Sequence, residues 1–206
     1  MRSRFAVLTL VGVLVLALAS CADQEPGVAR PVPDAGQTST GGDPPPTSET
    51  SEQELPPRPR ELSVADLDPC TLFTDVQRAE LMVDSVETDE AGGNEIFEGM
   101  QECVLGREQS EPYVTYTMIA MTTTDASFWL EHNAAAEVFE VGGFPAVEFR
   151  ARGAEDADCA VAVGVAEGQQ LHFSMLAISE DLTGDELCQR NTQLAEMAVA
   201  TLQTLR

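Results

Sequence analysis

The chemistry open to this chain depends first on its 5 cysteines and 2 histidines, because these residue types bind metals, form disulfides or act as nucleophiles. Cys21 stands apart from the other cysteines. It ends the run Leu18-Ala19-Ser20-Cys21, in which an apolar and two small residues precede the cysteine. This arrangement is typical of lipoprotein processing, where the thiol takes a diacylglyceryl group and the cysteine becomes the mature N-terminus. We therefore predict lipidation at Cys21, since two acyl chains anchor a protein stably in a membrane.

Residues 1–20 have the composition of a lipoprotein signal peptide. Arg2 and Arg4 give a short positive start, and residues 5–18 form an apolar run that is shorter than the roughly 18 residues a spanning helix needs. An ordinary signal peptide with an incidental cysteine is the alternative, but the site does not end in the usual A-x-A. We expect a protein anchored to the cell membrane by lipid, with the rest of the chain on the extracellular side.

Residues 21–62 are expected to form a disordered tether. Most of the 12 prolines lie here, mixed with Ser, Thr, Gly and Glu, and large apolar side chains are almost absent. Such a segment cannot bury enough apolar surface to offset the entropy lost on ordering. The remaining residues, 63–206, are numerous enough for one globular domain with a hydrophobic core.

Two of the predicted helices begin with capping boxes, Thr74-x-x-Gln77 and Thr183-x-x-Glu186. The predicted helices are 75–82, 124–136 and 184–206, and the predicted strands are 83–88, 101–107, 113–122, 138–141, 146–151, 159–166 and 171–177. Gly142-Gly143-Phe144-Pro145 is expected to form a turn. Strands outnumber helices and no β-α-β alternation appears. The sequence therefore predicts an α+β fold in which an antiparallel sheet packs with helices and the C-terminal helix covers one face.

Four cysteines remain after Cys21, and an even number in an oxidising compartment predicts two disulfides with three possible connectivities. We favour the nearest-neighbour pairs Cys70–Cys103 and Cys159–Cys188, each of which joins a cysteine near a helix to one on a strand. A metal site is the weaker alternative because no C-x-x-C spacing is present and His132 and His172 are isolated. His132 lies in a predicted helix and is expected to be a solvated residue. No metal or other cofactor is expected.

The strand 159–166 has one bulky face and one small face. The bulky residues are Val161, Val163 and Val165, and the small ones are Ala160, Ala162 and Gly164. A bond between Cys159 and Cys188 would place the last helix on the valine face, because disulfide Cα atoms lie within about 7 Å. The small face then leaves room that is either filled by the predicted helix carrying Phe128 and Trp129 or left as a groove. For the groove we predict a ligand site with His172, Ser174 and Trp129.

Sequence patterns for catalysis are absent: the chain has no G-x-S-x-G, no H-E-x-x-H and no phosphate-binding glycine loop, so no catalytic residue is assigned. An acidic segment, expected to be a solvated loop, lacks the spacing of an EF-hand; its members are Asp89, Glu90, Asn94, Glu95 and Glu98.

The formal net charge is −24 and every basic residue is Arg. Nucleic acid is therefore an unsuitable partner, because phosphate binding needs clustered Lys and Arg.

The order of these features resembles a family of actinobacterial lipoproteins catalogued as domain of unknown function 3558. The resemblance covers the whole chain. It rests on the lipid-attachment site, the tether, the opening Asp68-Pro69-Cys70-Thr71-Leu72-Phe73-Thr74, the Cys103 strand, Val141-Gly142-Gly143-Phe144-Pro145-Ala146 and the last helix around Cys188. One departure is Leu105, where the family commonly has Trp. The organisation is also similar to extracellular sensor domains of mycobacterial Ser/Thr kinases. The resemblance implies an actinobacterial envelope protein and supplies no catalytic residues.

Three functions are compatible with this sequence. The first is a non-catalytic binding or sensor module for a small apolar or envelope ligand or a protein partner; we favour it because a disulfide-pinned domain on a long tether is suited to presenting a surface. The alternatives are a cell-wall-acting hydrolase and a purely structural envelope protein. A deep apolar pocket would favour the first, a cleft with carboxylates about 5–10 Å apart the second, and a flat polar surface the third.

Overall fold

A computed structural model describes residues 54–93, 95–133, 135–150, 158–178 and 182–206, all within the unit Glu49–Arg206. The predicted signal peptide, Cys21 and the predicted tether as far as residue 53 lie outside the described residues. Within the described part of the chain, none of the helices combines the length and apolar character needed to cross a bilayer.

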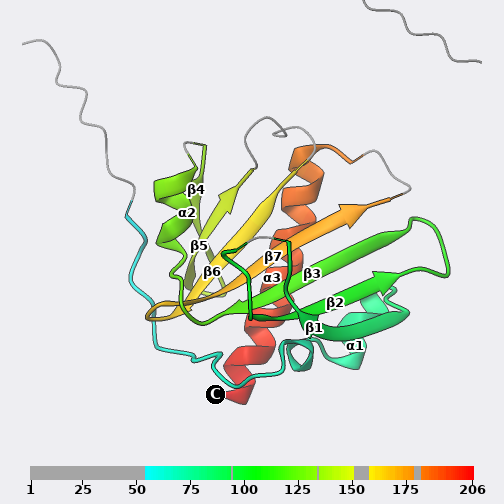
Figure 1. Cartoon of the computed structure of the whole chain (residues 1–206), viewed down its shortest axis with the longest axis horizontal. Coiled ribbons are helices and arrows are strands. Elements are labelled where there is room, and N and C mark those ends of the chain that lie inside the picture. The colour runs from blue at the N-terminus through cyan, green and yellow to red at the C-terminus, as the bar shows by residue number, and fades with distance from the viewer. Residues whose placement is uncertain (1–53, 94, 134, 151–157, 179–181) are drawn as a thin grey trace, which may run out of the picture. The chain divides into compact units, whose positions relative to one another are not determined.

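The domain is built on one antiparallel sheet of seven strands in the order β1-β2-β3-β7-β6-β5-β4 (Figure 1). The strands are β1 (Ser85–Glu90), β2 (Gln101–Arg107), β3 (Val114–Met121), β4 (Glu137–Val141), β5 (Phe144–Phe149), β6 (Ala160–Ala166) and β7 (Gln169–Ala177). Strands that follow each other in the chain pair with each other, except that β3 pairs with β7 instead of β4. That pairing joins an N-terminal half of three strands to a C-terminal half of four. The antiparallel sheet and its helices confirm the predicted α+β fold.

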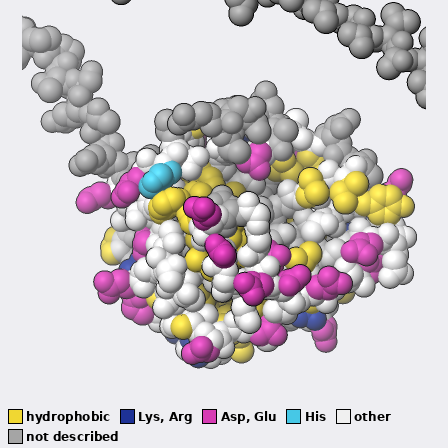
Figure 2. All heavy atoms as spheres, viewed as in Figure 1, with side chains coloured by type: hydrophobic (Ala, Val, Ile, Leu, Met, Phe, Trp, Pro, Cys, Tyr) yellow, Lys and Arg dark blue, Asp and Glu magenta, His cyan; other side chains and the backbone are white. Residues whose placement is uncertain are grey.

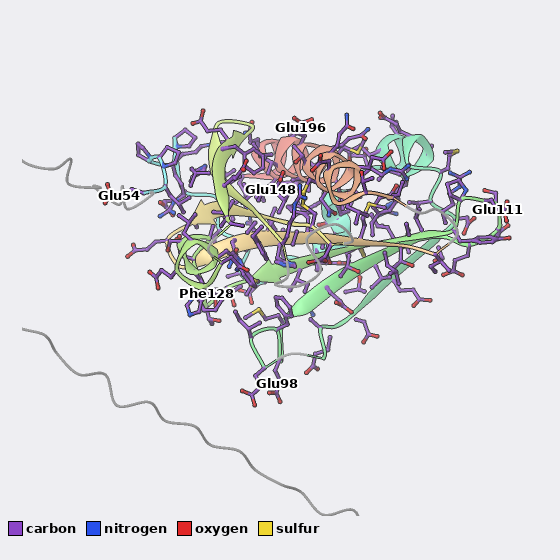
Figure 3. All side chains as sticks on the ribbon, turned by 90° about the horizontal axis from the view of Figure 1, so that it is seen from above. Glu54, Glu98, Glu111, Phe128, Glu148 and Glu196 are labelled. Carbon is purple, nitrogen blue, oxygen red and sulfur yellow. A yellow bond between two sulfur atoms is a disulfide. The ribbon has the colours of Figure 1, made fainter. Side chains whose placement is uncertain are left out.

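One face of the sheet carries the main core. Helix α3 (Gly184–Leu205) lies across it, and the short η1 (Pro69–Leu72) and α1 (Asp75–Glu80) lie on the same side (Figures 1 and 3). Leu194, Ala198 and Leu202 of α3 are fully buried in one cluster with the bulky residues Val161, Val163 and Val165 of β6. The predicted position of the last helix is therefore confirmed, and so are the capping boxes at Thr74 and Thr183.

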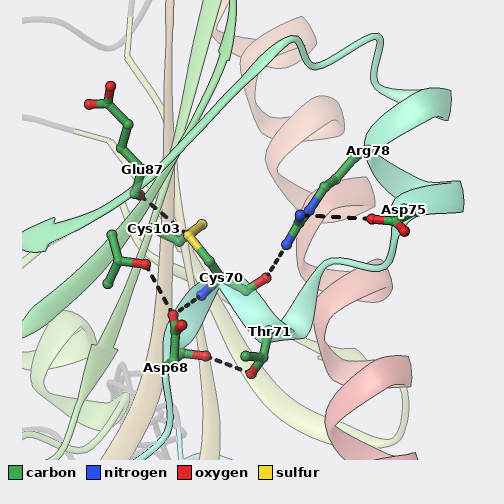
Figure 4. Close-up of a disulfide and its surroundings, with 8 residues drawn as sticks. Asp68, Cys70, Thr71, Asp75, Arg78, Glu87 and Cys103 are labelled. Atoms are coloured by element: carbon green, nitrogen blue, oxygen red, sulfur yellow. Dashed lines mark hydrogen bonds and ion pairs between the residues drawn. A yellow bond between two sulfur atoms is a disulfide. The ribbon is translucent and has the colours of Figure 1, made fainter.

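Both predicted disulfides are present. Cys70–Cys103 joins η1 to β2, and Cys159–Cys188 joins the start of β6 to the first turns of α3. Around the first bond, Asp68 accepts a hydrogen bond from the Cys70 N–H, and Arg78 donates to the Cys70 carbonyl at 2.8 Å (Figure 4). These contacts hold η1 against the sheet, so α1 and the N-terminal half of the sheet form one packed body.

Several predicted boundaries differ from the structure. Strand β1 runs to Glu90, so Asp89 and Glu90 lie in a strand and not in the predicted acidic loop. Helix α2 spans Ser127–His132 and is not capped by Thr124; the Asp125 carboxylate instead accepts a hydrogen bond from the Ser127 N–H, and Asn133 already has an extended backbone. Gly142 and Gly143 alone make the turn between β4 and β5, because both have positive φ, whereas Phe144 and Pro145 continue into β5 as buried strand residues.

Contacts with the domain begin before residue 63. Leu62 is 2% exposed and its N–H donates to the Val165 carbonyl at 2.8 Å. Further back, Arg58 forms an ion pair with Asp125 at 3.3 Å, next to the start of α2. These residues fall in the range that the composition assigned to the tether. Leu55 also packs on the domain and Arg60 donates to the Gln203 carbonyl, so the last residues of this range are held on the domain surface.

Candidate functional site

The second face of the sheet, opposite α3, divides into a covered half and an open half. Along β7 this face carries in turn Gln170, His172, Ser174 and Leu176, which pair with Met121, Ile119, Thr117 and Thr115 of β3. The first two of the β7 residues are buried, Ser174 is partly exposed, and Leu176 is exposed. The border between the two halves therefore lies close to His172.

Helix α2 and the segment between β1 and β2 cover the first half. Trp129 of α2 stacks on Phe149 with ring centroids 4.2 Å apart, and its indole N–H donates to the Gln170 side-chain oxygen at 2.9 Å. Phe97 contributes a second ring, 5.0 Å from the ring of His172. Below them, the small face of β6 packs against Ala126 and Trp129. The sequence left two alternatives for the space above the small face of β6, a covering helix or a groove. The structure shows the first, because α2 covers this face.

His172 belongs to this packed layer. It is 5% exposed and lies among the rings of Phe97, Trp129 and Phe149. Burial lowers the pKa of His172 to about 4, so the imidazole is neutral near pH 7, and its buried Nδ1 has no hydrogen-bond partner among the described residues. The structure thus brings His172, Ser174 and Trp129 to one face, with two of them in the packed layer and Ser174 beyond it. Their role in binding a ligand stays a prediction.

Among the described residues, no helix lies over the second half of this face (Figure 3). At its β7 end Leu176 and Ile178 are 63% and 65% exposed, and Tyr113, whose carbonyl accepts from the Ile178 N–H, is 38% exposed. At its β1 end the strand positions are acidic. We call this surface the open face. By strand register it includes Glu87, Asp89, Glu102, Val104, Thr115, Thr117, Ser174 and Leu176. We extend it by Tyr113 and Ile178, the hydrogen-bonded residues that directly precede β3 and follow β7.

The open face has an acidic end and an apolar end. Asp89 and Glu102 are direct partners across β1 and β2. The pKa of Glu102 is raised, first because the carboxyl is partly buried and second because of the charge of Asp89. Figure 2, viewed from the side of α2, shows acidic side chains across this side of the molecule, few basic ones, and hydrophobic side chains both beside the histidine and at the opposite edge. The surface is thus a sheet whose exposed groups change from charged to apolar across four strands.

A polar cleft of about 710 Å³ lies on the other side of the sheet, between β5 and α3. Arg150 at the end of β5 contacts the Asp185 carboxylate at 2.6 Å and that of Glu148 at 3.8 Å through the same nitrogen. Partial burial raises the pKa of Glu148, and Arg150 opposes this shift. Figure 3 shows Glu148 between β4 and α3. The cleft is therefore an ion-paired, water-accessible hollow beside the Cys159–Cys188 bond.

The described part of the chain contains no group of side chains suited to binding a metal ion. In that part of the chain, Glu148, Cys159 and Cys188 lie together, with their potential ligand atoms within 4.8 Å of one another. Both sulfurs are in a disulfide and offer no thiolate, so this group cannot act as a zinc site. His132 lies exposed at the end of α2 with Nδ1 2.7 Å from the Phe128 carbonyl. In the predicted acidic loop Glu90, Glu95 and Glu98 are exposed, while Asn94 lies outside the described residues.

Residues 16–201 match the family model described as "Protein of unknown function (DUF3558)". The chain belongs to this family. Comparison with curated proteins and with solved structures gives no match. The described structure therefore defines, for this DUF3558 chain, a sheet with one face packed under helices and a second face that is only half covered, while its activity has to be inferred from the surfaces.

Sequence reasoning missed three features of the DUF3558 domain. Phe97 was placed in a solvated loop, although Ile96, Phe97 and Met100 are spaced as an apolar group that could have indicated packing. Gln170 was not assigned a role, and it binds Trp129. The exposed pair Leu176 and Ile178 continues the alternation of His172 and Ser174 along β7, which was the available signal for an apolar patch on that face.

Proposed function

We propose that this DUF3558 chain is a lipid-anchored protein of the cell envelope whose domain binds a protein partner without catalysing a reaction. The observation that carries the proposal is the open face. Leu176 and Ile178 are large apolar side chains that stay more than half exposed beside Tyr113, whereas the apolar residues on the α3 side of the same strands are buried. Adjacent exposed apolar groups on a rigid element are a mark of interaction sites.

The shape of this surface favours a macromolecular partner over a small ligand. A flat sheet surface cannot enclose a small molecule, and small-molecule sites are concave and bury most of their ligand. A flat surface also fits a purely structural envelope protein, but that role does not require the apolar end at Leu176 and Ile178. The Cys70–Cys103 bond fixes β2 to η1, which keeps the open face rigid and lowers the entropy lost on binding.

The membrane part of the proposal rests on Leu18-Ala19-Ser20-Cys21 and the apolar run before it. A lipid on Cys21 and a proline-rich segment after it would hold the domain at the membrane and leave it free to turn toward a partner. The excess of acidic residues supports this arrangement, because anionic lipid headgroups would repel the domain and so leave its faces accessible.

Site-specific photo-crosslinking in cells tests the binding role. A photoreactive residue replaces Thr117 at the centre of the open face, and in a matched control it replaces Val76, which is 77% exposed on α1 at the opposite side. We expect an adduct of one defined mass from position 117 alone, and its loss when Leu176→Glu is added. Equal adducts from both positions, or an adduct that survives Leu176→Glu, would contradict a binding role for this surface.

A second candidate function is suggested by the polar cleft. Glu148 with a raised pKa beside the carboxylate of Asp185 is the type of pair that hydrolyses glycosidic bonds, with one neutral acid and one ionised partner. Arg150 counts against it, because its charge lowers the pKa of Glu148 and its side chain occupies both carboxylates. Release of reducing ends from peptidoglycan by the full chain, at least a hundredfold slower with Glu148→Gln, would support this function; no release would eliminate it.

A further inference from the structure

We infer that the partner which docks on the open face presents a basic polypeptide segment, with an apolar side chain at one end and Lys or Arg about four to six extended residues away. This inference rests on the proposed binding role and adds the chemistry of the partner. It is carried by the order of groups across four paired strands, from the acids of β1 and β2 to Leu176 and Ile178 of β7.

At the acidic end of the open face, the described strands place no basic side chain beside the carboxylates. Asp89 and Glu102 are cross-strand partners, and Glu87 is two residues along β1 on the same face. Like charges placed directly opposite each other destabilise a sheet. Within the described strands, no Lys or Arg occupies a position on this face. A cation from outside the chain would remove the repulsion, which a neutral or acidic partner would not.

Glu102 supports the same assignment. Its carboxyl is partly buried between Asp89 on one side and Ile119 on the other, and both the burial and the neighbouring charge raise its pKa. A guanidinium or ammonium group placed beside the two carboxylates would favour their ionised forms and would form charge-assisted hydrogen bonds with them. The acidic end is therefore prepared for a positive group.

The spacing follows from the sheet. Strands lie about 4.8 Å apart, so three steps separate β1 from β7 by roughly 14 Å. Along the strands, Leu176 is aligned through Thr115 and Gly106 with Ser85, which lies two residues from Glu87 and four from Asp89. The acids of β1 therefore lie roughly 16–20 Å from Leu176. An extended peptide advances about 3.3 Å per residue and presents alternate side chains to one surface. An apolar residue at one position and a basic residue four to six positions later would therefore reach both ends at once, with the hydroxyls of Thr117 and Ser174 beneath the segment between them.

Charge argues against the other occupants. A second copy of this chain would bring a surface with the same acids and the same net charge of −24. An anionic membrane and a nucleic acid would be repelled in the same way. A basic segment is attracted to the acidic end from a distance, and electrostatic attraction raises association rates and selects among partners.

Methyl NMR of the full chain in phosphatidylcholine nanodiscs tests this inference, because the lipid adds no net charge. The probe is a synthetic peptide, Leu-Ser-Leu-Ser-Arg-Ser-Arg-Ser, whose Leu and Arg side chains share one face when extended. Two control peptides replace Arg by Glu or Leu by Ser. We expect shifts of the methyl signals of Val104, Leu176 and Ile178 with the first peptide, at least tenfold weaker binding of both controls, and no shift at Val76.

Two double variants with the same change in charge complete the test. Glu87→Gln with Glu102→Gln should weaken binding roughly three- to tenfold, since each exposed charge contact contributes little. Glu80→Gln with Glu196→Gln, on exposed residues of the helical side, should leave binding unchanged. Equal binding of the Arg and Glu peptides at Leu176 would overturn the charge assignment and leave the binding role intact. Absence of shifts at Leu176, or equal shifts at Val76, would overturn the inference, and the crosslinking at Thr117 would then decide the binding role separately.

Discussion

His172 is the group through which mildly acidic pH should weaken this fold. Burial lowers the pKa of the folded-state imidazole to about 4, against the ordinary value of 6.5. Between these two pH values the unfolded chain binds a proton at this position and the folded chain does not, so the free energy of unfolding falls as the pH is lowered through this window. Below about pH 4 and above about pH 6.5, His172 causes no further change in the free energy of unfolding.

The magnitude follows from the size of the shift. Each pKa unit corresponds to about 1.4 kcal/mol, so the shift of His172 amounts to about 3 kcal/mol between pH 7 and pH 4. His172→Phe removes the titrating group and keeps a ring among Phe97, Trp129 and Phe149. Relative to the wild type, the variant should therefore gain about 3 kcal/mol of stability as the pH falls over this range, whatever its stability at pH 7.

Urea unfolding followed by far-ultraviolet circular dichroism measures this difference at intervals of half a pH unit, with both disulfides intact. Glu61 and Glu186 also titrate at low pH, but their contributions are common to both proteins and cancel in the difference. His132→Gln is the matched control, because it removes the exposed histidine of α2, and its curve should run parallel to the wild type. A difference between His172→Phe and wild type that stays constant from pH 7 to pH 4 would refute the argument from burial.

Three further outcomes follow from the sequence and the structure. Cys21→Ser should release the protein into the medium, and unchanged membrane retention would contradict the predicted lipid anchor. Ala162→Trp should cost at least 1–3 kcal/mol, or prevent folding, because Ala162 is fully buried under α2; denaturant unfolding decides this, and a stable variant would reopen the groove. Thr183→Ala should lower the free energy of unfolding by about 1 kcal/mol through loss of the α3 cap, whereas the exposed Thr123→Ala should change it by less than about half of that.

Local chemistry was sufficient to predict several parts of this domain. The capping boxes at Thr74 and Thr183 depend on groups three residues apart, so no tertiary information is needed to find them. The alternation of large and small residues in β6 identified its two faces. Once Cys159 was paired with Cys188, the length of a disulfide left one place for α3.

The tertiary structure alone decided which part of the second face is closed. Periodicity shows that a residue lies on a face, but it does not show what packs on that face, because covering elements come from distant sequence. Phe97 follows β1 and Trp129 follows β3, yet both rings meet His172 of β7. The pairing of β3 with β7 sets the open face in the same way, since it joins the acids of β1 and β2 to Leu176 through strands far apart in the chain. The sequence by itself determined the elements and their apolar sides, and non-local packing decided which surfaces remained available for binding.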